Sequence, residues 1–509
     1  MMRSVAIIRN SIWGTAQQMT ICILSIFSRR VMLETVGQLG VGLNDLLSSV
    51  ISLLSLAELG VGTAIVYRMY EPIAKGDRVQ IVKLMHCYKI VYRMIACVIF
   101  ALGLCLLPFM GGIVRDVPYS PSYVSAIFLL FLIHTTSSYF FTYKRSMLSA
   151  DQKQYIITIF DLVYRLVTIL AGIAVLKVTG ELACYLLLLI VSTVIDNLLL
   201  SLYVDRLYPY LRQGGSRLPW EEVRQIFRDV KNIFVEKLST VLVNSTDSIL
   251  INAFVGTVQT GLFSNYNIII HTLSGVTNQI SAGMRGSVGN LIAVEGVGPV
   301  EAALKKLTFM MFLIASFCAG CLAGLMDRFV ALAFGAGLEI GGGVVSLMIF
   351  GLFLSTVSIP IKCMTSAAGL FVWDKWISLI GSAVNLILSL LLGWRLGMVG
   401  ILAGTCAAYL LHLCLRIAVF YTKFLKKGCR AMLGWIGAFT LTAAAECAAV
   451  AWCCQGIDIV NDVVSFVICG VVAALLPSGL NVIFFHRTAV FQGVLNTIKD
   501  VLMRYRTAG

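Results

Sequence analysis

Long apolar stretches recur along the chain, and they constrain its fold more than any other feature of the sequence. A membrane-spanning helix needs about 20 mostly apolar residues, and stretches of this kind repeat from near residue 10 to near residue 485. Of the 509 residues, 59% are hydrophobic and only 13% are charged, whereas roughly a quarter of a soluble protein is charged. The sequence therefore predicts a polytopic membrane protein and excludes a soluble multidomain enzyme, a fibrous chain and a disordered chain.

The apolar stretches predict an all-α protein with fourteen spans. We expect them at residues 10–32, 41–66, 90–112, 122–143, 155–176, 182–204, 233–255, 261–284, 307–326, 344–369, 376–396, 399–421, 433–454 and 463–485. Basic residues collect in cytoplasmic loops. Of the 39 Lys and Arg residues, 31 fall in the tails and loops on the same side of the membrane as the N-terminus, and six fall on the opposite side. We therefore expect both termini in the cytoplasm, and the net charge of +14 does not indicate nucleic-acid binding.

A repeated element divides the chain into two halves. Val36-Gly37-x4-Gly42-Leu43 follows the first expected span, and Val255-Gly256-x4-Gly261-Leu262 follows the seventh. Six spans between the copies give both halves the same orientation, related by a pseudo-two-fold axis along the membrane normal. We expect an N-lobe of spans 1–6, a cytoplasmic loop, a C-lobe of spans 7–12, and two further spans with a cytoplasmic tail, at residues 1–206, 207–232, 233–425 and 426–509.

Polar residues form stripes along several of the expected spans. Span one carries Ser11, Thr15, Gln18, Cys22, Ser25 and Arg29, and span eight carries Asn267, His271, Ser274, Asn278, Ser281 and Arg285. Spacings of three and four place each set on one helix face. Such residues can simply join helices, but whole stripes that include charges favour a water-filled cavity between two six-helix lobes.

Ionisable residues within or at the ends of the spans are the candidates for function. We expect the cavity to bind its substrate through Arg29, Arg30, Asp45, Arg145, Asn244, Asn267, Arg285 and Lys362. The cationic members favour an anionic cargo such as a phosphate, although Arg145 and Lys362 can equally be ordinary cytoplasmic-side charge. Asp247, near the middle of span seven, and His271 are the candidates for ion coupling. Asp161 and Arg165, four residues apart in span five, are expected to pair with each other.

No cofactor, metal site or catalytic domain is expected. Cys318-x-x-Cys321 lies within an expected span and has no second pair nearby, so it does not predict a zinc site. The sequence has no phosphate-binding loop of the ATPase type. The expected outer loops are too short and too poor in charge for a polysaccharide polymerase or ligase. The protein is therefore expected to be a transporter and not an enzyme.

Several motifs resemble those of a known family of bacterial transporters. They are Asn10-x2-Trp13, Gly37-x4-Gly42-Leu43, the run from Glu58 to Ala64 (ELGVGTA), the run from Tyr67 to Pro72 (YRMYEP), and Tyr92-Arg93. Together with the fourteen-span layout, they are similar to the Wzx-type polysaccharide and O-antigen flippases of the multidrug/oligosaccharidyl-lipid/polysaccharide (MOP) exporter superfamily. The resemblance covers nearly the whole chain.

The resemblance implies a two-lobed transporter with a central cationic cavity. Its cargo would be an oligosaccharide on undecaprenyl pyrophosphate, moved from the inner to the outer leaflet of the bacterial cytoplasmic membrane by alternating access. The implied partners are this lipid-linked glycan, membrane lipids and a coupling proton or sodium ion. Two alternatives stay open, a lipid II flippase and an ion-coupled drug or metabolite antiporter of the same superfamily.

Overall fold

The computed structural model describes residues 2–58, 61–114, 119–151, 153–212, 218–294, 297–457 and 461–496, and nearly all of them are helical. No strand occurs in these ranges. Eleven of the helices in the described ranges are long and apolar enough to cross a membrane. The predicted class, an all-α multi-pass membrane protein, is confirmed, while the number of fourteen spans stays a prediction. The chain forms two compact units, Met1–Ser264 and Asn265–Gly509.

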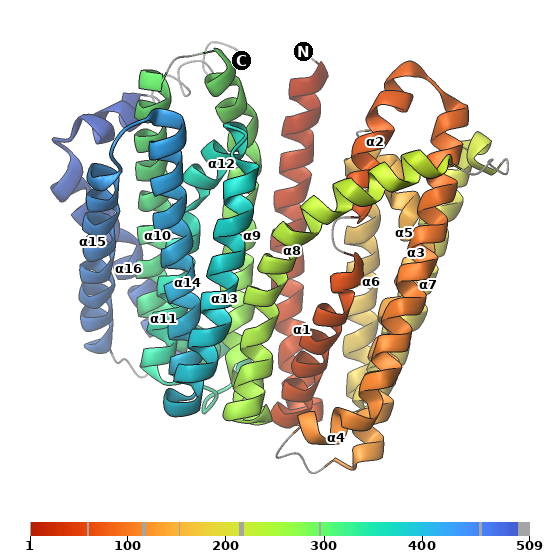
Figure 1. Ribbon diagram of the computed structural model, residues 1–509. Coiled ribbons are helices and arrows are strands. Elements are labelled where there is room, and N and C mark those ends of the chain that lie inside the picture. The colour runs from red at the N-terminus through yellow and green to blue at the C-terminus, as the bar shows by residue number, and fades with distance from the viewer. Residues whose placement is uncertain are drawn as a thin grey trace. The chain divides into compact units, whose positions relative to one another are not determined.

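Unit 1 is a bundle of α-helices joined by short turns (Figure 1). Its helices are α1 (Met2–Leu54), α2 (Val61–Lys75), α3 (Arg78–Leu106), α4 (Met110–Ile113), α5 (Pro121–Ala150), α6 (Gln154–Thr179), α7 (Leu182–Leu207), α8 (Trp220–Phe254) and the start of α9 (Thr257–Val294). Short 3-10 turns occur at Ser55–Glu58, Leu107–Phe109 and Pro209–Arg212. Much of the stretch expected as a loop over 207–232 is thus helical, because α8 begins at Trp220 and runs obliquely across its unit in Figure 1.

A glycine corner divides α1 into the two segments that were expected as separate spans. Gly37 has φ 69° and ψ 177°, a backbone conformation that side chains with a Cβ rarely adopt. The second segment ends at Leu54, continues as the 3-10 turn Ser55–Glu58, and α2 begins only at Val61. The span expected over 41–66 therefore contains the end of α1, a 3-10 turn at Ser55–Glu58 and the start of α2, and residues 59 and 60 lie outside the described residues.

The two copies of the repeated glycine element pack directly against each other inside unit 1. A Cβ added to Gly42 would lie 2.2 Å from the carbonyl oxygen of Thr257. A Cβ added to Gly261 would lie 2.5 Å from Gln38 Nε2 and 3.1 Å from the backbone nitrogen of Gly42. Small residues allow helices to approach this closely in membranes. The glycines that suggested a sequence repeat therefore also mark the contact between the second segment of α1 and the start of α9.

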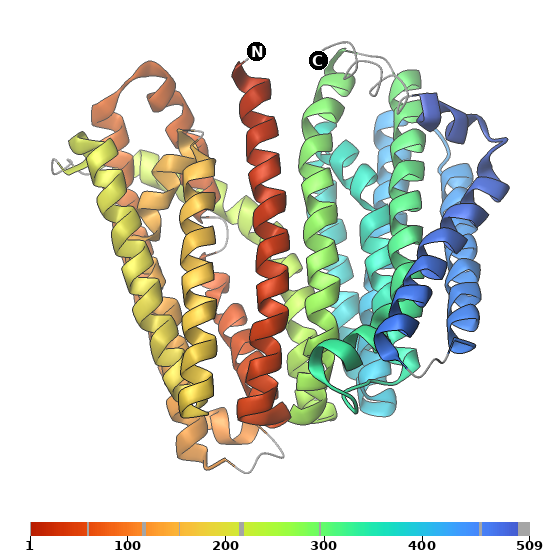
Figure 2. The ribbon, with the colours of Figure 1, turned by 180° about the vertical axis from the view of Figure 1, so that it is seen from behind.

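Unit 2 contains the remaining helices, seen from both sides in Figures 1 and 2. They are the rest of α9, then α10 (Val297–Phe334), α11 (Gly342–Val357), α12 (Ile359–Ala367), α13 (Phe371–Leu396), α14 (Met398–Val419), α15 (Arg430–Gln455) and α16 (Asp462–Phe485), with a π-helical turn at Phe420–Leu425. Packing of α14 on α13 again depends on glycine, since a Cβ on Gly400 would lie 2.2 Å from Leu392 O. In the same interface, Ser389 Oγ donates to Ile401 O at 3.0 Å.

Aromatic rings and small residues hold α10, α15 and α16 together. Phe312 on α10 stacks on Phe439 of α15 with ring centroids 4.3 Å apart, and Phe485 of α16 closes the group at 5.5 Å from Phe312. Further along α10, Gly320 allows the ring of Pro477 on α16 to approach. The two C-terminal helices are therefore packed parts of unit 2, on the flank where Figures 1 and 2 show the end of the chain in blue.

The glycine contact in unit 1 leads to a direct prediction. Gly42→Ala forces the backbone of α1 away from Thr257, and overpacking of this kind typically costs about 1–3 kcal/mol of unfolding free energy. The matched control is Gly289→Ala on α9, where an added Cβ meets nothing within 4 Å. Thermal unfolding of the purified protein in detergent should show a lower midpoint for Gly42→Ala and an unchanged or higher midpoint for Gly289→Ala. Equal midpoints would contradict the close packing.

Candidate functional site

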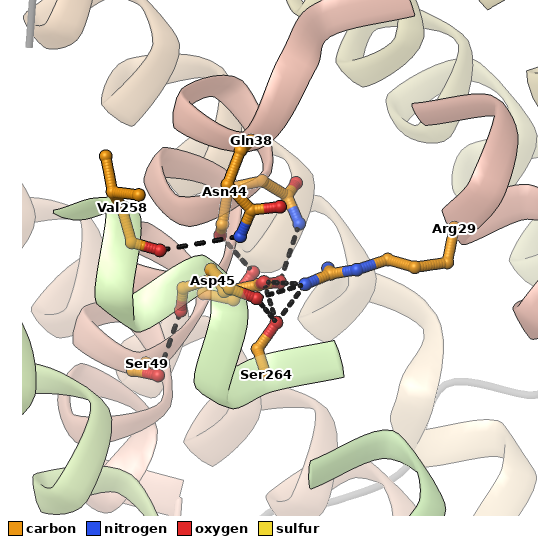
Figure 3. A network of polar contacts seen from close by, with 9 residues as sticks. Arg29, Gln38, Asn44, Asp45, Ser49, Val258 and Ser264 are labelled. Atoms are coloured by element: carbon orange, nitrogen blue, oxygen red, sulfur yellow. Dashed lines mark hydrogen bonds and ion pairs between the residues drawn. The ribbon is translucent and has the colours of Figure 1, made fainter. Parts of the chain in front are cut away.

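Two of the predicted cavity residues, Arg29 and Asp45, lie across the glycine corner of α1 from each other (Figure 3). Each is eight residues from Gly37, one before it and one after it. Arg29 Nη2 is 2.7 Å from Asp45 Oδ2, and the side chains are 6% and 19% exposed. An arginine removed from water is very costly without a partner, so the corner positions each charge where the other compensates it.

Ser264, near the start of α9, completes this polar network. Arg29 Nη2 donates to the Ser264 hydroxyl and, at 3.3 Å, to the carbonyl oxygen of Gly261. The Ser264 hydroxyl in turn donates to Asp45 Oδ2. Asp45 lies nine residues after Val36, and Ser264 nine residues after Val255. Asp45 and Ser264 therefore occupy equivalent positions in the two copies of the repeat, and both contact the Arg29 guanidinium.

Two amide side chains extend the network. Asn44 Nδ2 donates to Asp45 Oδ1 at 3.1 Å, and Gln38 Nε2 donates to Val258 O at 3.4 Å. Both oxygens of the Asp45 carboxylate therefore accept hydrogen bonds. The network as a whole carries one positive and one negative charge, and it joins both segments of α1 to the start of α9.

The predicted cavity residue Arg145 binds two carboxylates in unit 1. On α5, Arg145 Nη1 lies 2.5 Å from Asp161 Oδ1 of α6, and its Nη2 pairs with Asp196 Oδ2 of α7. The predicted pair between Asp161 and Arg165 is wrong: Asp161 pairs with Arg145, and the Arg165 side chain is exposed. The forked guanidinium of Arg145 can bond two carboxylates on different helices at once. A pair within one helix, such as Asp161 with Arg165, cannot provide this double contact. The triad carries a net charge of −1.

The other predicted residues are spread over both units. Arg30 is exposed and pairs with Glu34 at 3.0 Å, and Asp247 is buried on α8 with an exposed fraction of 7%. In unit 2, Asn267 is half-buried on α9, while His271 on α9 and Lys362 on α12 are exposed. The side chains of Asn244 and Arg285 lie outside the described residues. Of the predicted set, the structure brings together only Arg29 and Asp45 among the described residues of unit 1.

The Glu-Leu-Gly motif forms a second polar cluster in unit 1 that the sequence did not indicate. Tyr92 donates its hydroxyl to Glu58 Oε1 at 2.8 Å, and Tyr88 OH lies 2.9 Å from Ser146 Oγ. Gly62 leaves room for both rings, since a Cβ there would lie 2.9 Å from Tyr92 OH. Glu58 therefore connects the turn Ser55–Glu58 to Tyr92 of α3, and Tyr88 connects α3 to Ser146 of α5.

Unit 2 contains an apolar cavity of about 620 Å³ between α10, α11 and α15. Small side chains of α10 and α15 line much of it, among them Ala319, Ala323, Ala444 and Ala448. Asp327 is the charged residue in the lining, and it accepts a hydrogen bond from Tyr266 OH at 2.6 Å. A cavity with this lining suits a hydrocarbon chain better than a polar ligand.

Comparison with known proteins identifies relatives of the chain in sequence and in fold. Residues 7–284 match the family model described as "Polysaccharide biosynthesis protein". No curated protein matches the chain in sequence. Three solved transporters share its fold at 12–17% identity, and at this level the match shows the fold alone.

The three structures cover most of the chain. The lipid II flippase MurJ, in an inward closed conformation, gives a TM-score of 0.66 and 12% identity over 93% of this chain and 99% of that chain. An inward-facing multidrug resistance MATE family transporter of the MOP superfamily gives a TM-score of 0.62 and 14% identity, over 82% of this chain and 99% of that chain. The MATE multidrug transporter DinF-BH gives a TM-score of 0.59 and 17% identity, over 82% of this chain and 95% of that chain. The chain therefore has the fold of MOP-superfamily transporters.

The buried ion pair leads to a prediction on stability. Asp45→Ala leaves the Arg29 guanidinium buried without its carboxylate, and breaking one partner of a buried pair typically costs about 3–5 kcal/mol. The double variant Arg29→Met/Asp45→Leu removes both charges and should recover most of that loss. Thermal unfolding in detergent measures both. If the double variant is as unstable as the sum of the single variants Asp45→Leu and Arg29→Met, the two side chains are not coupled.

Proposed function

The chain belongs to the polysaccharide biosynthesis protein family, and on that premise we propose that it is a flippase for a lipid-linked oligosaccharide. The cargo is an oligosaccharide on undecaprenyl pyrophosphate, moved from the inner to the outer leaflet of the bacterial cytoplasmic membrane for cell-surface polysaccharide synthesis. The observation that carries the proposal is the family match over residues 7–284, which includes the whole Arg29–Asp45–Ser264 network. The fold of MOP-superfamily transporters supports it.

The mechanism is alternating access through a cationic cavity between an N-lobe, residues 1–206, and a C-lobe, residues 233–425. Sugars and a pyrophosphate carry many polar groups, each of which costs several kcal/mol in hydrocarbon without a partner. A wet cavity lined by polar side chains replaces their water, while the polyprenyl tail stays in an apolar environment. Rocking of the two lobes exposes the cavity to each side in turn.

Arg29 is the residue we assign to the pyrophosphate. Its guanidinium already holds one carboxylate, at 2.7 Å, and phosphate oxygens accept charge-assisted hydrogen bonds from a guanidinium in the same way as a carboxylate. Cargo binding at Arg29 therefore competes with Asp45. The remaining cationic candidates are Arg30, Arg285 and Lys362, with Asn244 and Asn267 as neutral ligands; Arg145 is the weakest candidate, because two carboxylates already hold it.

The apolar cavity between α10, α11 and α15 is the place we assign to part of the polyprenyl tail. Its volume of about 620 Å³ and its alanine-rich lining suit a branched hydrocarbon chain. Helices α15 and α16, which follow residue 426 and lie outside the repeat, are then assigned to contacts with the polyprenyl tail. Asp247 and His271 are our candidates for coupling to a proton or sodium gradient, and both termini are proposed to face the cytoplasm.

A lipid II flippase is the second candidate, because MurJ shares the fold over 93% of this chain. Both cargoes carry a pyrophosphate on a polyprenyl chain, so the residues proposed here serve either one. An ion-coupled antiporter of the superfamily would export small cations and would need acidic residues in its cavity. The protein is a transporter in all three cases, and it is not proposed to be an enzyme.

Depletion of the protein in its host separates these candidates. We expect polyprenyl-pyrophosphate oligosaccharide to accumulate on the cytoplasmic leaflet, and surface polysaccharide to decrease, while lipid II stays at its normal level. Lipid extraction with analysis of the released glycans measures this directly. Accumulation of lipid II would favour the second candidate, and normal levels of both lipids would overturn the proposal.

Arg29 provides the residue-level prediction. Arg29→Gln should reduce complementation of a depleted strain by about 10-fold or more, because a charge-assisted contact to phosphate is typically worth about 1.5–3 kcal/mol. The control Lys75→Gln removes an exposed basic residue whose partner is Glu71, and it should complement normally. Membrane levels of each variant are measured in parallel. Full complementation by Arg29→Gln would remove Arg29 from the cargo site.

A further inference from the structure

A fully buried glutamate lies at the junction of α10, α15 and α16 in unit 2, outside every residue assigned above. Glu446 on α15 and Ser316 on α10 are 0% exposed, and Asn481 on α16 is 4% exposed. One side chain comes from each of the three helices. A carboxyl placed this deep inside a helix bundle requires partners for both of its oxygens.

The three side chains form an ordered series of hydrogen bonds. Asn481 Nδ2 donates to Ser316 Oγ at 2.9 Å, and the Ser316 hydroxyl then donates to Glu446 Oε2. Each donor in the series therefore points the same way around the cluster, from Asn481 to Ser316 to Glu446.

Two buried oxygens remain after these bonds are counted. Within the part of the chain that the structure describes, Glu446 Oε1 and Asn481 Oδ1 have no hydrogen-bond partner. Both atoms are acceptors if Glu446 is ionised, so two adjacent groups would lack a donor. One proton on Glu446 Oε1 turns that oxygen into a donor. Asn481 Oδ1 is the other buried oxygen of the cluster that lacks a donor, so it is the acceptor to which we assign this proton, and every acceptor of the cluster would then have one donor.

The surroundings of the cluster disfavour a bare negative charge. On one side lie the packed rings of Phe312, Phe439 and Phe485, again one from each helix. On the other side, Pro477 packs on Gly320, where an added Cβ would be 2.5 Å from the proline Cγ. Apolar packing of this kind leaves an ionised carboxylate without solvation.

Charged groups on the same helices are too far away to compensate Glu446. The nearest charged residues along each described helix are Lys306 and Asp327 on α10, Arg430 on α15 and Asp462 on α16. Each is at least ten positions from the cluster residue on its helix, or about 15 Å at the usual helical rise. The closer titratable groups on these helices are the thiols of Cys318 and Cys321 on α10 and of Cys447, Cys453 and Cys454 on α15. Just past the end of α16, His486 and Arg487 lie five and six positions from Asn481, and both side chains are exposed. Of the neighbouring helices, α11 has no charged side chain, α12 carries Lys362, and Arg416 of α14 pairs with Asp374 at 2.6 Å.

A metal cation fits the cluster less well than a proton. Among the described residues, no group of three or more His, Cys, Asp or Glu side chains could hold a metal ion. The three side chains of the cluster together offer four oxygen atoms at most, and cations such as calcium take six or more oxygen ligands. A single proton needs no more than the two atoms that are present.

We propose that Ser316, Glu446 and Asn481 form a proton-binding site, in which Glu446 is a neutral carboxylic acid that joins α10, α15 and α16. Removal of the proton leaves a charged carboxylate in an apolar junction, so it requires these helices to separate or water to enter. Helix α16 is weakened next to the cluster, because Pro477, four residues before Asn481, interrupts its backbone hydrogen bonds. Pro477 has no N–H to donate to Ala473 O, and this carbonyl oxygen instead accepts from Cys321 Sγ at 3.6 Å. The site therefore links protonation to the packing of the C-terminal helices, whatever cargo the protein carries.

Infrared spectroscopy of the reconstituted full-length protein tests the proton directly. We expect the carbonyl band of a hydrogen-bonded carboxylic acid at neutral pH, absent in Glu446→Gln and unchanged in Glu181→Gln, which alters an exposed glutamate. Asn481→Leu removes the acceptor and should shift the band to the frequency of a free acid. The loss of the band in Glu446→Gln assigns it to Glu446, and Glu181→Gln controls for the other carboxyl groups of the chain. Absence of the band in the wild type would overturn the proposal.

The pH dependence of thermal unfolding provides the second readout. Glutamates in the unfolded chain ionise near pH 4.3, so a carboxyl that stays protonated when folded makes the folding equilibrium constant fall by up to about tenfold per pH unit above that point. Glu446→Gln keeps a donor for Asn481 Oδ1 in its amide, and it should lose this part of the pH profile. A pH profile that is the same in the wild type and in Glu446→Gln, with a wild-type midpoint that rises with sodium, would identify a cation site instead, against the proposal.

Discussion

The cost of an unpaired charge in hydrocarbon governs how this protein places its polar side chains. The buried Arg29 and the half-buried Arg145 are held by carboxylates on other helix segments, Arg29 by Asp45, and Arg145 by Asp161 and Asp196. Each pair joins helices that apolar packing alone would hold only weakly, since lipid and apolar side chains offer similar environments. The ionisable residues therefore determine which helices are neighbours inside each unit, and they do so before any cargo is considered.

Much of the fold could be predicted from the sequence because hydropathy and glycine spacing are local properties. The apolar stretches predicted the helices, and the corner between the first two spans was marked by Gly37, whose φ of 69° few other residues tolerate. The breaks could not be placed, because the end of α1 at Leu54 and the early start of α8 at Trp220 depend on packing within unit 1. Helix ends respond to such contacts more than to the local pattern.

The partners of the candidate residues were harder to predict than the residues themselves. Asp161 was assigned to Arg165 because four-residue spacing places both on one helix face, but Arg145 reaches it from another helix and binds it with a second carboxylate. Ser264 could have been found: it stands at the position of Asp45 in the second copy of the glycine element. No such signal connects Ser316, Glu446 and Asn481, which come together only through the packing of three helices.

The position of Ser264 connects the proposed cargo site to the internal repeat. Arg29, Asp45 and Ser264 share one network, and the last two come from equivalent positions of the two copies. If an anionic cargo takes the guanidinium, Asp45 loses its counter-charge and the contact between the copies loses a partner at the same moment. A ligand shifts a conformational equilibrium only by binding the two states unequally. In the proposed mechanism, competition between phosphate and carboxylate for one arginine would supply such a difference, because the packed state keeps Arg29 on Asp45 and the proposed cargo-bound state would not.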